Sequence, residues 1–325
     1  MSRRDFLLRS SVALAGATLG PWSEARSATP EAGPNEAAAA AGTLWLGGDV
    51  QVNRLGFGAM RLTGDGIWGE PRDENEARAV LRRAVELGVN FIDTADAYGP
   101  YISERLIREA LCPNPRGPYP RGLIIATKGG IVRPRREEWL ADGRPQHLRA
   151  ACESSLTRLK LERIDLYQLH RPDPNVPYED SIGELAKLQK EGKIRHIGVS
   201  NVDAQQLATA RALVKVVSVQ NRYNVADRLA DDVLAVCQQE QIAFIPWAPL
   251  AQGAQASAAP DKRVAALEAI AKERHIDQNQ ASLAWLLARS PVMLPIPGTS
   301  RVDHLEDNVG AAKIKLTAEE MARVG

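Results

Sequence analysis

The sequence is poor in cysteine, in net charge and in metal-binding motifs, and each shortage excludes a class of protein. Its three cysteines, Cys112, Cys152 and Cys237, lie far apart without a CxxC pair, which argues against a disulfide framework and a zinc site. We expect them to be packing residues. The 41 basic and 40 acidic residues leave a net charge of +1, so the basic excess typical of nucleic-acid-binding proteins is missing. No HExxH motif occurs, and we predict no metal site.

The first 42 residues differ in character from the rest of the chain. A pair of arginines precedes a modest apolar segment, which is too short and too weak to insert stably in a membrane as a helix. This pattern resembles a twin-arginine (Tat) export signal, and residues 25–27 resemble a cleavage site. We therefore predict a Tat signal over residues 1–28 and a flexible linker over residues 29–42. The Tat machinery would then export the folded protein to the periplasm or cell exterior; if the signal is not used, the protein stays cytoplasmic.

From Thr43 onward, short apolar runs alternate with amphipathic helical stretches. A β-hairpin is predicted around Gly47–Asp49. Eight apolar runs follow, and the helices are expected to begin near Asp73, Ser103, Pro145, Tyr178, Asp203, Ala230, Asp261 and Val302. Eight strand–helix units in roughly 270 residues predict an α/β fold, a (β/α)₈ TIM barrel over residues 43–325. An extra helix, "QNQASLAWLLAR", precedes the eighth strand, which is expected in "VMLPIPG". The alternative, a Rossmann sheet, lacks its Gly-x-Gly-x-x-Gly turn.

Polar side chains end three consecutive apolar runs. Asp93 ends the second run, Lys128 the third and His170 the fourth, and Tyr98 lies in the loop after Asp93. The C-terminal ends of barrel strands form the mouth at which active sites lie, so we expect these four side chains to lie together. Each alone has a structural interpretation: a helix cap, an exposed lysine, a core histidine and a loop aromatic. Together they indicate a catalytic site.

The four side chains suit proton donation to a carbonyl oxygen during hydride transfer. Tyrosine has an ordinary pKa of about 10, and the ammonium group of Lys128 is expected to lower the pKa of Tyr98. A buried lysine needs a counter-charge, which Asp93 would supply. His170 would hydrogen-bond the substrate carbonyl and orient it.

The chain resembles the aldo-keto reductase superfamily from about Thr43 to its end. The motifs that carry the resemblance are "GFGAMRL", "GVNFIDTADAYG", "ATKGG", "IDLYQLHRPDP", "IRHIGVSN", "SVQNRYN" and "LPIPGTSRVDHLEDN". The resemblance implies that Asp93, Tyr98, Lys128 and His170 are catalytic, with Tyr98 as the acid. Two segments resemble a bacterial, pyridoxal-reductase-like branch that acts on small aldehydes.

The resemblance also implies NADPH as cofactor, with NADH as the alternative, bound extended across the barrel mouth. Ser200, Asn201 and Gln220 match residues that hold the nicotinamide carboxamide, and Trp247 matches the aromatic that stacks on the nicotinamide ring. The other expected cofactor contacts are Leu250, Gly298, Thr299, Ser300, Arg301, Asp307 and Asn308. Those at residues 298–300 lie ahead of a helix N-terminus, which suits a phosphate.

Three positions depart from the pattern of the superfamily. Many members have a lysine in place of Gly298 and an arginine in place of His304, both for the 2′-phosphate of NADPH. Arg301 is therefore expected to supply that charge here. A serine that commonly contacts the pyrophosphate is replaced by Ala248.

The substrate pocket is expected to be lined by residues of two loops. Arg61 and Trp68 follow the first strand, where Arg61 would meet an anionic group of the substrate. The basic cluster "RPRREEW", residues 133–139, is expected to be a solvated loop with one aromatic facing the cleft. The sequence thus predicts an NADPH-dependent enzyme that reduces small, pyridoxal-like or aromatic carbonyl compounds. The alternative is an NAD(P)H-binding sensor or regulatory subunit with little turnover.

Overall fold

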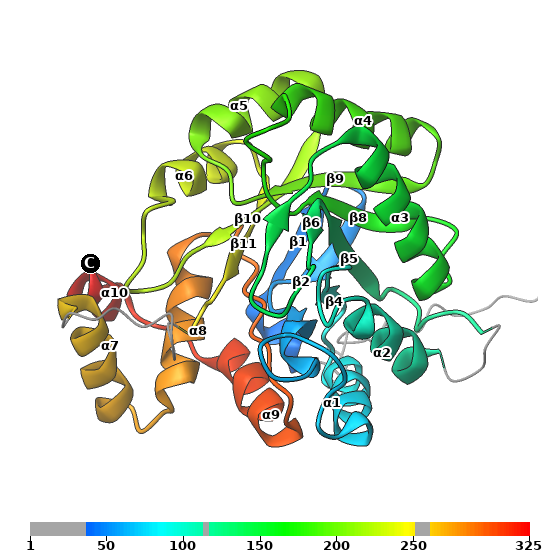
Figure 1. Ribbon diagram of the computed structural model, residues 1–325. Coiled ribbons are helices and arrows are strands. Elements are labelled where there is room, and N and C mark those ends of the chain that lie inside the picture. The colour runs from blue at the N-terminus through cyan, green and yellow to red at the C-terminus, as the bar shows by residue number, and fades with distance from the viewer. Residues whose placement is uncertain (1–36, 113–116, 251–260) are drawn as a thin grey trace, which may run out of the picture. The chain divides into compact units, whose positions relative to one another are not determined.

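The computed structural model describes residues 37–112, 117–250 and 261–325, so the predicted Tat signal lies outside the described residues. Its centre is a seven-stranded parallel sheet that curls into a barrel (Figure 1). The strands are β3 (Phe57–Gly58), β4 (Phe91–Asp93), β5 (Ile124–Gly129), β8 (Ile164–Leu169), β9 (Ile194–Ser200), β10 (Val216–Arg222) and β11 (Ala243–Trp247). They lie side by side in chain order, as in a barrel built from successive strand–helix units.

The segment predicted as the eighth strand closes the barrel without forming a regular strand. On one side it bonds to Phe244 of β11: the Phe244 amide donates to the carbonyl of Val292 (2.9 Å), and the Leu294 amide donates to the carbonyl of Phe244 (2.8 Å). On the β3 side, the Gly56 amide donates to the carbonyl of Pro295 (2.9 Å) and the Gly58 amide to that of Pro297 (3.4 Å). Pro295 and Pro297 have no amide hydrogen, so they cannot return a bond to β3. The predicted (β/α)₈ barrel is confirmed, with this segment in place of strand eight.

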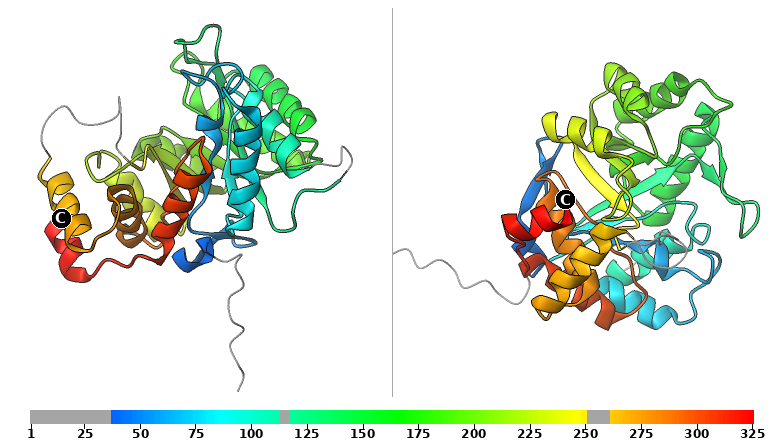
Figure 2. Two further views of the ribbon diagram at one scale, coloured as in Figure 1. Left: turned by 90° about the horizontal axis from the view of Figure 1, so that it is seen from below. Right: turned by 90° about the vertical axis from the view of Figure 1, so that its left-hand side faces the viewer.

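Helices surround the sheet (Figures 1 and 2). They are α1 (Glu74–Glu86), α2 (Ile102–Leu111), α3 (Pro145–Leu159), α4 (Tyr178–Lys190), α5 (Ala204–Leu213), α6 (Asp231–Gln239), α7 (Lys262–Glu273), α8 (Gln278–Arg289), α9 (Val302–Gly310) and α10 (Ala318–Val324). The predicted helix starts lie within one residue of the observed ones, and α8 is the predicted extra helix. Asp73 and Asp203 explain two of these starts, because their side chains accept the first free amide N–H groups of α1 and α5.

The N-terminal hairpin covers one end of the barrel. Strands β1 (Thr43–Leu46) and β2 (Val50–Asn53) pair antiparallel, as predicted, and their buried side chains join the apolar cluster inside the sheet. Gly47 has a φ of +63°, and a Cβ atom there would lie 2.3 Å from the ring of His196. The turn therefore needs glycine to approach β9 so closely. The opposite end, at the carboxyl ends of the strands, stays open.

The described end of the predicted flexible linker, residues 37–42, contains a short helix. Ala38–Ala41 form a 3₁₀ helix, η1, in which Ala38 and Ala41 are buried. The amide of Ala38 donates to the carbonyl of Leu87 (3.0 Å). Alanine's small side chain permits this close packing, whereas a run of alanines gives the sequence no hydrophobic pattern from which to predict it.

Two short strands extend the loop after β5. β6 (Ile131–Val132) pairs antiparallel with β7 (Leu140–Ala141), so the predicted solvated loop, residues 133–139, connects the two strands of a small hairpin. The three cysteines are buried and free, which confirms that they are packing residues. Within the described ranges, no helix is long and apolar enough to cross a membrane.

Candidate active site

A cavity of about 470 Å³ lies at the carboxyl ends of the barrel strands. Of the residues predicted for the site, those that line it are Arg61, Asp93, Tyr98, His170, Ser200, Asn201, Gln220, Trp247, Leu250 and Gly298. Lys128 lies beneath this surface and is fully buried. The strand ends thus bring together side chains that are far apart in the sequence.

Lys128 contacts two of the other predicted catalytic residues. Its Nζ atom donates to Oδ2 of Asp93 (2.6 Å), to the hydroxyl oxygen of Tyr98 (3.2 Å) and to the carbonyl of Thr94 (2.9 Å). Burial alone would lower the pKa of Lys128, but its interactions with Asp93 and Tyr98 together outweigh burial, and the pKa is raised. The lysine therefore stays an ammonium ion at neutral pH.

Tyr98 keeps its proton more strongly than the sequence suggested. Burial raises its pKa above the usual value, and the charge of Lys128 lowers it by less than burial raises it. The expected direction of the lysine effect is correct, but the net shift is upward because the hydroxyl is removed from water. Tyr98 is therefore a phenol, ready to donate, at neutral pH.

His170 is a neutral imidazole at the edge of the cavity. Burial, together with the charges of Lys128 and Arg171, lowers its pKa well below the usual value. Its ring lies 5.8 Å from that of Tyr98, centroid to centroid, in an edge-on arrangement. Its Nδ1 atom has no hydrogen-bond partner among the described residues.

A glutamine that the sequence analysis missed supports Asp93. Gln168 is fully buried and donates to Oδ1 of Asp93 (3.1 Å), which also accepts a bond from Gln220 (2.8 Å). Gln168 lies two residues before His170, and alternate residues of a strand share a face. That spacing was the available signal for a polar side chain inside the barrel.

The residues predicted for the nicotinamide carboxamide already form a hydrogen-bonded group. Asn201 accepts a bond from the indole N–H of Trp247 (3.0 Å), and its amide nitrogen donates to the hydroxyl of Ser200 and the carbonyl of His170 (both 3.0 Å). Asn201 thereby orients Trp247 at the cavity wall. The amide of Asn201 is thus already hydrogen-bonded through both its oxygen and its nitrogen, whereas Ser200 still has a hydroxyl hydrogen to donate.

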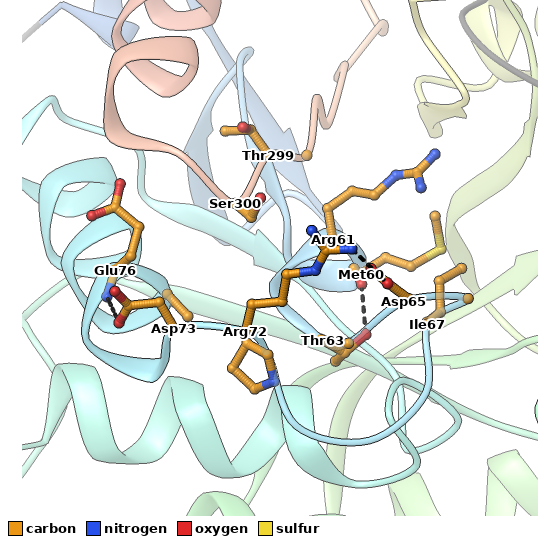
Figure 3. A pocket seen from close by; sticks show the side chains of 15 residues that line it. Met60, Arg61, Thr63, Asp65, Ile67, Arg72, Asp73, Glu76, Thr299 and Ser300 are labelled. Atoms are coloured by element: carbon orange, nitrogen blue, oxygen red, sulfur yellow. Dashed lines mark hydrogen bonds and ion pairs between the residues drawn. The ribbon is translucent and has the colours of Figure 1, made fainter.

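A second hollow of about 640 Å³ continues from the cavity toward α1 and α9 (Figure 3). Gly298, Thr299 and Ser300 line it, and both Arg61 and Gly298 line the cavity as well. The two hollows therefore meet at these residues, so Arg61 lies beside both rather than beside the substrate pocket alone. A Cβ atom on Gly298 would lie 2.4 Å from the carbonyl oxygen of Gly58, so a larger residue, such as lysine, does not fit there.

The N-terminus of α9 has a partner that the sequence did not reveal. The amide of Val302 donates to the carboxylate of Glu76 on α1 (3.1 Å), and Glu76 lines the hollow (Figure 3). Arg301, predicted to meet the 2′-phosphate, is exposed and paired with Asp303. A free backbone N–H in the first turn of α9 is thus taken by a carboxylate.

Within the described structure, four residues predicted to contact the substrate or cofactor line neither hollow. They are Trp68, Arg301, Asp307 and Asn308. Trp68 lies instead against the guanidinium of Arg133, whose carbon is 5.4 Å from the ring centroid. The predicted solvation of residues 133–139 is wrong for Arg133, which is buried, while Trp139 faces the cavity as expected.

Comparison with known proteins identifies relatives along most of the chain. The model of the aldo/keto reductase family matches residues 54–325. The chain is 52% identical over 287 residues to an uncharacterized oxidoreductase of Schizosaccharomyces pombe, covering 88% of this chain and 90% of the relative. It is 40% identical over 281 residues to the pyridoxine 4-dehydrogenase of Escherichia coli, covering 85% and 94% of the two chains.

Solved structures agree with the sequence relatives. An aldo/keto reductase from Klebsiella pneumoniae in complex with NADP and acetate is 27% identical, with a TM-score of 0.71 over 87% of this chain and 93% of that one. A thermostable aldo-keto reductase in complex with epalrestat is 31% identical, with a TM-score of 0.73 over 87% and 98%. Fold and sequence therefore lead to the same group of enzymes.

Proposed function

The chain belongs to the aldo/keto reductase family, and we propose that this NAD(P)H-dependent oxidoreductase reduces small aldehydes or ketones to alcohols. It binds NADPH, which supplies a hydride to the carbonyl carbon. The observation that carries the proposal is the buried contact of Lys128 with both Asp93 and Tyr98. Pyridoxal-like and other aromatic aldehydes are the proposed substrates, supported by the similarity to pyridoxine 4-dehydrogenase.

Tyr98 is the proposed proton donor. Its hydroxyl is protonated at neutral pH because burial raises its pKa, so it has a proton to give to the carbonyl oxygen. As that proton leaves, the negative charge on the phenol oxygen develops 3.2 Å from the Lys128 ammonium, which stabilises it. Hydride and proton together convert C=O to CH–OH, and Tyr98 regains its proton from solvent.

His170 is the proposed orienting residue. A neutral imidazole donates one hydrogen bond to the carbonyl oxygen without adding a charge that would compete with Tyr98. Because the imidazole lies beside the Tyr98 ring, a single carbonyl oxygen of the substrate can reach both the imidazole and the Tyr98 hydroxyl.

The residues of the two connected hollows suit the cofactor. Ser200 and Gln220 offer a hydroxyl and an amide to the carboxamide, and Trp247, held by Asn201, offers a ring face. Thr299 and Ser300 offer hydroxyl groups farther along. We propose Arg61, at the junction, as a cation for the cofactor's diphosphate, in place of its expected role toward the substrate.

Oxidation of NADPH by the full chain, followed by the change in its absorbance, tests the proposal. Pyridoxal and benzaldehyde are supplied in turn, NADH is compared with NADPH, and Tyr98→Phe is run in parallel. Turnover that collapses in Tyr98→Phe supports the reductase. Tight NADPH binding without turnover of either aldehyde would favour the sensor instead.

We also propose that residues 1–28 direct Tat export, on the strength of the arginine pair and the apolar segment behind it. Replacing Arg3 and Arg4 together by lysine should leave the protein in the cytoplasmic fraction. An unchanged distribution between cytoplasmic and exported fractions would contradict the proposal.

A further inference from the structure

The hairpin after β5 holds a buried arginine behind the wall of the cavity. Arg133 is 8% exposed, although its loop is rich in arginine. Its guanidinium donates to the backbone carbonyls of Ile67 (3.1 Å), Gly66 (3.3 Å), Ala97 (3.3 Å) and Arg136. Arg133 therefore connects the loop after β3, the loop that carries Tyr98, and its own hairpin.

The same guanidinium packs on tryptophan. Its carbon atom lies 3.6 Å from the ring centroid of Trp139. Trp139 lines the cavity, and its ring is 6.4 Å from that of Tyr98 in an edge-on arrangement. Arg133 does not line the cavity itself; it supports a ring that does.

This arrangement is specific to arginine. Arg133 forms no ion pair among the described residues, and Glu137, the acidic group whose charge acts on it, is exposed. Burying an unpaired charge costs free energy, and here carbonyl dipoles and the indole face offset that cost. A lysine has neither the planar fork to reach several carbonyls nor a flat group to stack.

We propose that Arg133 is a positioning residue that fixes Trp139 as a rigid wall of the substrate pocket, and that this wall selects aldehydes attached to a planar ring. The inference rests on the proposed reductase function and names its substrate class. A fixed indole offers a large apolar face to a ring, and it loses little conformational freedom when the substrate binds. A short aliphatic chain gains less from the same wall.

Matched variants of the full chain test the selectivity. Arg133→Lys and Trp139→Ala are compared with Arg135→Lys, an arginine of the same hairpin whose side chain is 79% exposed. With NADPH, Arg133→Lys should lower kcat/KM for benzaldehyde about tenfold and that for butanal by less than about twofold. Arg135→Lys should change neither value.

The double variant shows whether Arg133 acts through Trp139. If it does, Arg133→Lys in the Trp139→Ala background should cause no further fall in the benzaldehyde-to-butanal ratio. Equal falls for both aldehydes in Arg133→Lys, or no fall for either, would overturn the proposal, because either outcome means that Arg133 does not determine selectivity.

Near-ultraviolet circular dichroism gives a second measurement that needs no turnover. The indole bands lost in Trp139→Ala should weaken in Arg133→Lys and persist in Arg135→Lys. Persistence in Arg133→Lys would overturn the positioning role. Failure of the wild type to reduce any aldehyde would instead overturn the proposed function and, with it, the selectivity, while the dichroism still decides whether Arg133 fixes the ring.

Discussion

The Nζ atom of Lys128 lies 2.6 Å from Oδ2 of Asp93, and both side chains are buried. The other carboxylate oxygen of Asp93 accepts bonds from Gln168 and Gln220. A buried ion pair contributes little net stability, since desolvation offsets the attraction. Its position under Tyr98 is better explained by chemistry: it keeps a cation 3.2 Å from the hydroxyl that would become negative.

Removing both members of this pair should cost less stability than the sum of the single changes. Asp93→Asn leaves a buried ammonium without its counter-charge, and Lys128→Met leaves a buried carboxylate, so each should cost about 3–5 kcal/mol of unfolding free energy. The double variant contains neither charge. Urea unfolding at neutral pH measures the unfolding free energy of the two single variants and the double variant. Additive losses would contradict the coupling, and the exposed pair Arg323–Glu273 provides a control that should change little.

The pH profile of kcat/KM for reduction should have a broad plateau. Burial lowers the pKa of His170 well below its usual value, so its ring stays neutral throughout the neutral range. Burial raises the pKa of Tyr98, so the proton needed for reduction is lost only above about pH 10. Activity should therefore hold from about pH 7 to about pH 9 and fall at higher pH. A fall centred near pH 8 would show that Lys128 outweighs burial.

The four predicted catalytic residues could be found from sequence because each breaks an apolar pattern where a strand ends or soon after. The helix starts were also predictable, since Asp73 and Asp203 cap their helices through local backbone bonds. Such features depend on neighbours along the chain. The barrel was predictable in the same way, because strands and helices alternate along the chain.

Other parts of the site depend on residues that meet only after folding. Glu76 reaches a backbone amide 226 positions away, and no local pattern marks it. Arg133 lies in a loop whose composition indicates exposure, but carbonyls from three segments converge on its guanidinium. Trp68 was expected in the pocket, yet it packs against that same guanidinium. Tertiary contacts decide each of these positions.

Tyr98→Phe should abolish most of the reductase activity without disturbing the cofactor site. Loss of a general acid lowers kcat about 10²- to 10⁴-fold, whereas the phenyl ring preserves the contacts with Trp139 and His170. Stopped-flow measurement of NADPH oxidation gives the rate, and fluorescence titration gives the Kd for NADPH. Retention of more than about a tenth of the rate would assign proton donation to another group.

Glu76→Gln should strengthen the binding of NADPH more than that of NADH. The carboxylate of Glu76 occupies the Val302 amide at the start of α9 and adds a negative charge to the hollow lined by Thr299 and Ser300, which disfavours a 2′-phosphate. Glutamine keeps an oxygen for that amide but removes the charge. Loss of the negative charge should lower the Kd for NADPH about fivefold, equivalent to roughly 1 kcal/mol of charge repulsion near a surface.

The control for Glu76→Gln is Glu86→Gln, at the other end of the same helix, where Glu86 pairs with Arg83 and lines neither hollow in the described structure. It should leave the Kd of both nucleotides unchanged. Equal strengthening of NADPH and NADH by Glu76→Gln would mean that Glu76 acts on the shared diphosphate rather than on the 2′-phosphate. Weaker binding of NADPH would mean that its carboxylate orders α9 for the cofactor. The sign of the change therefore decides whether this carboxylate opposes the cofactor's extra charge or organises the helix that receives it.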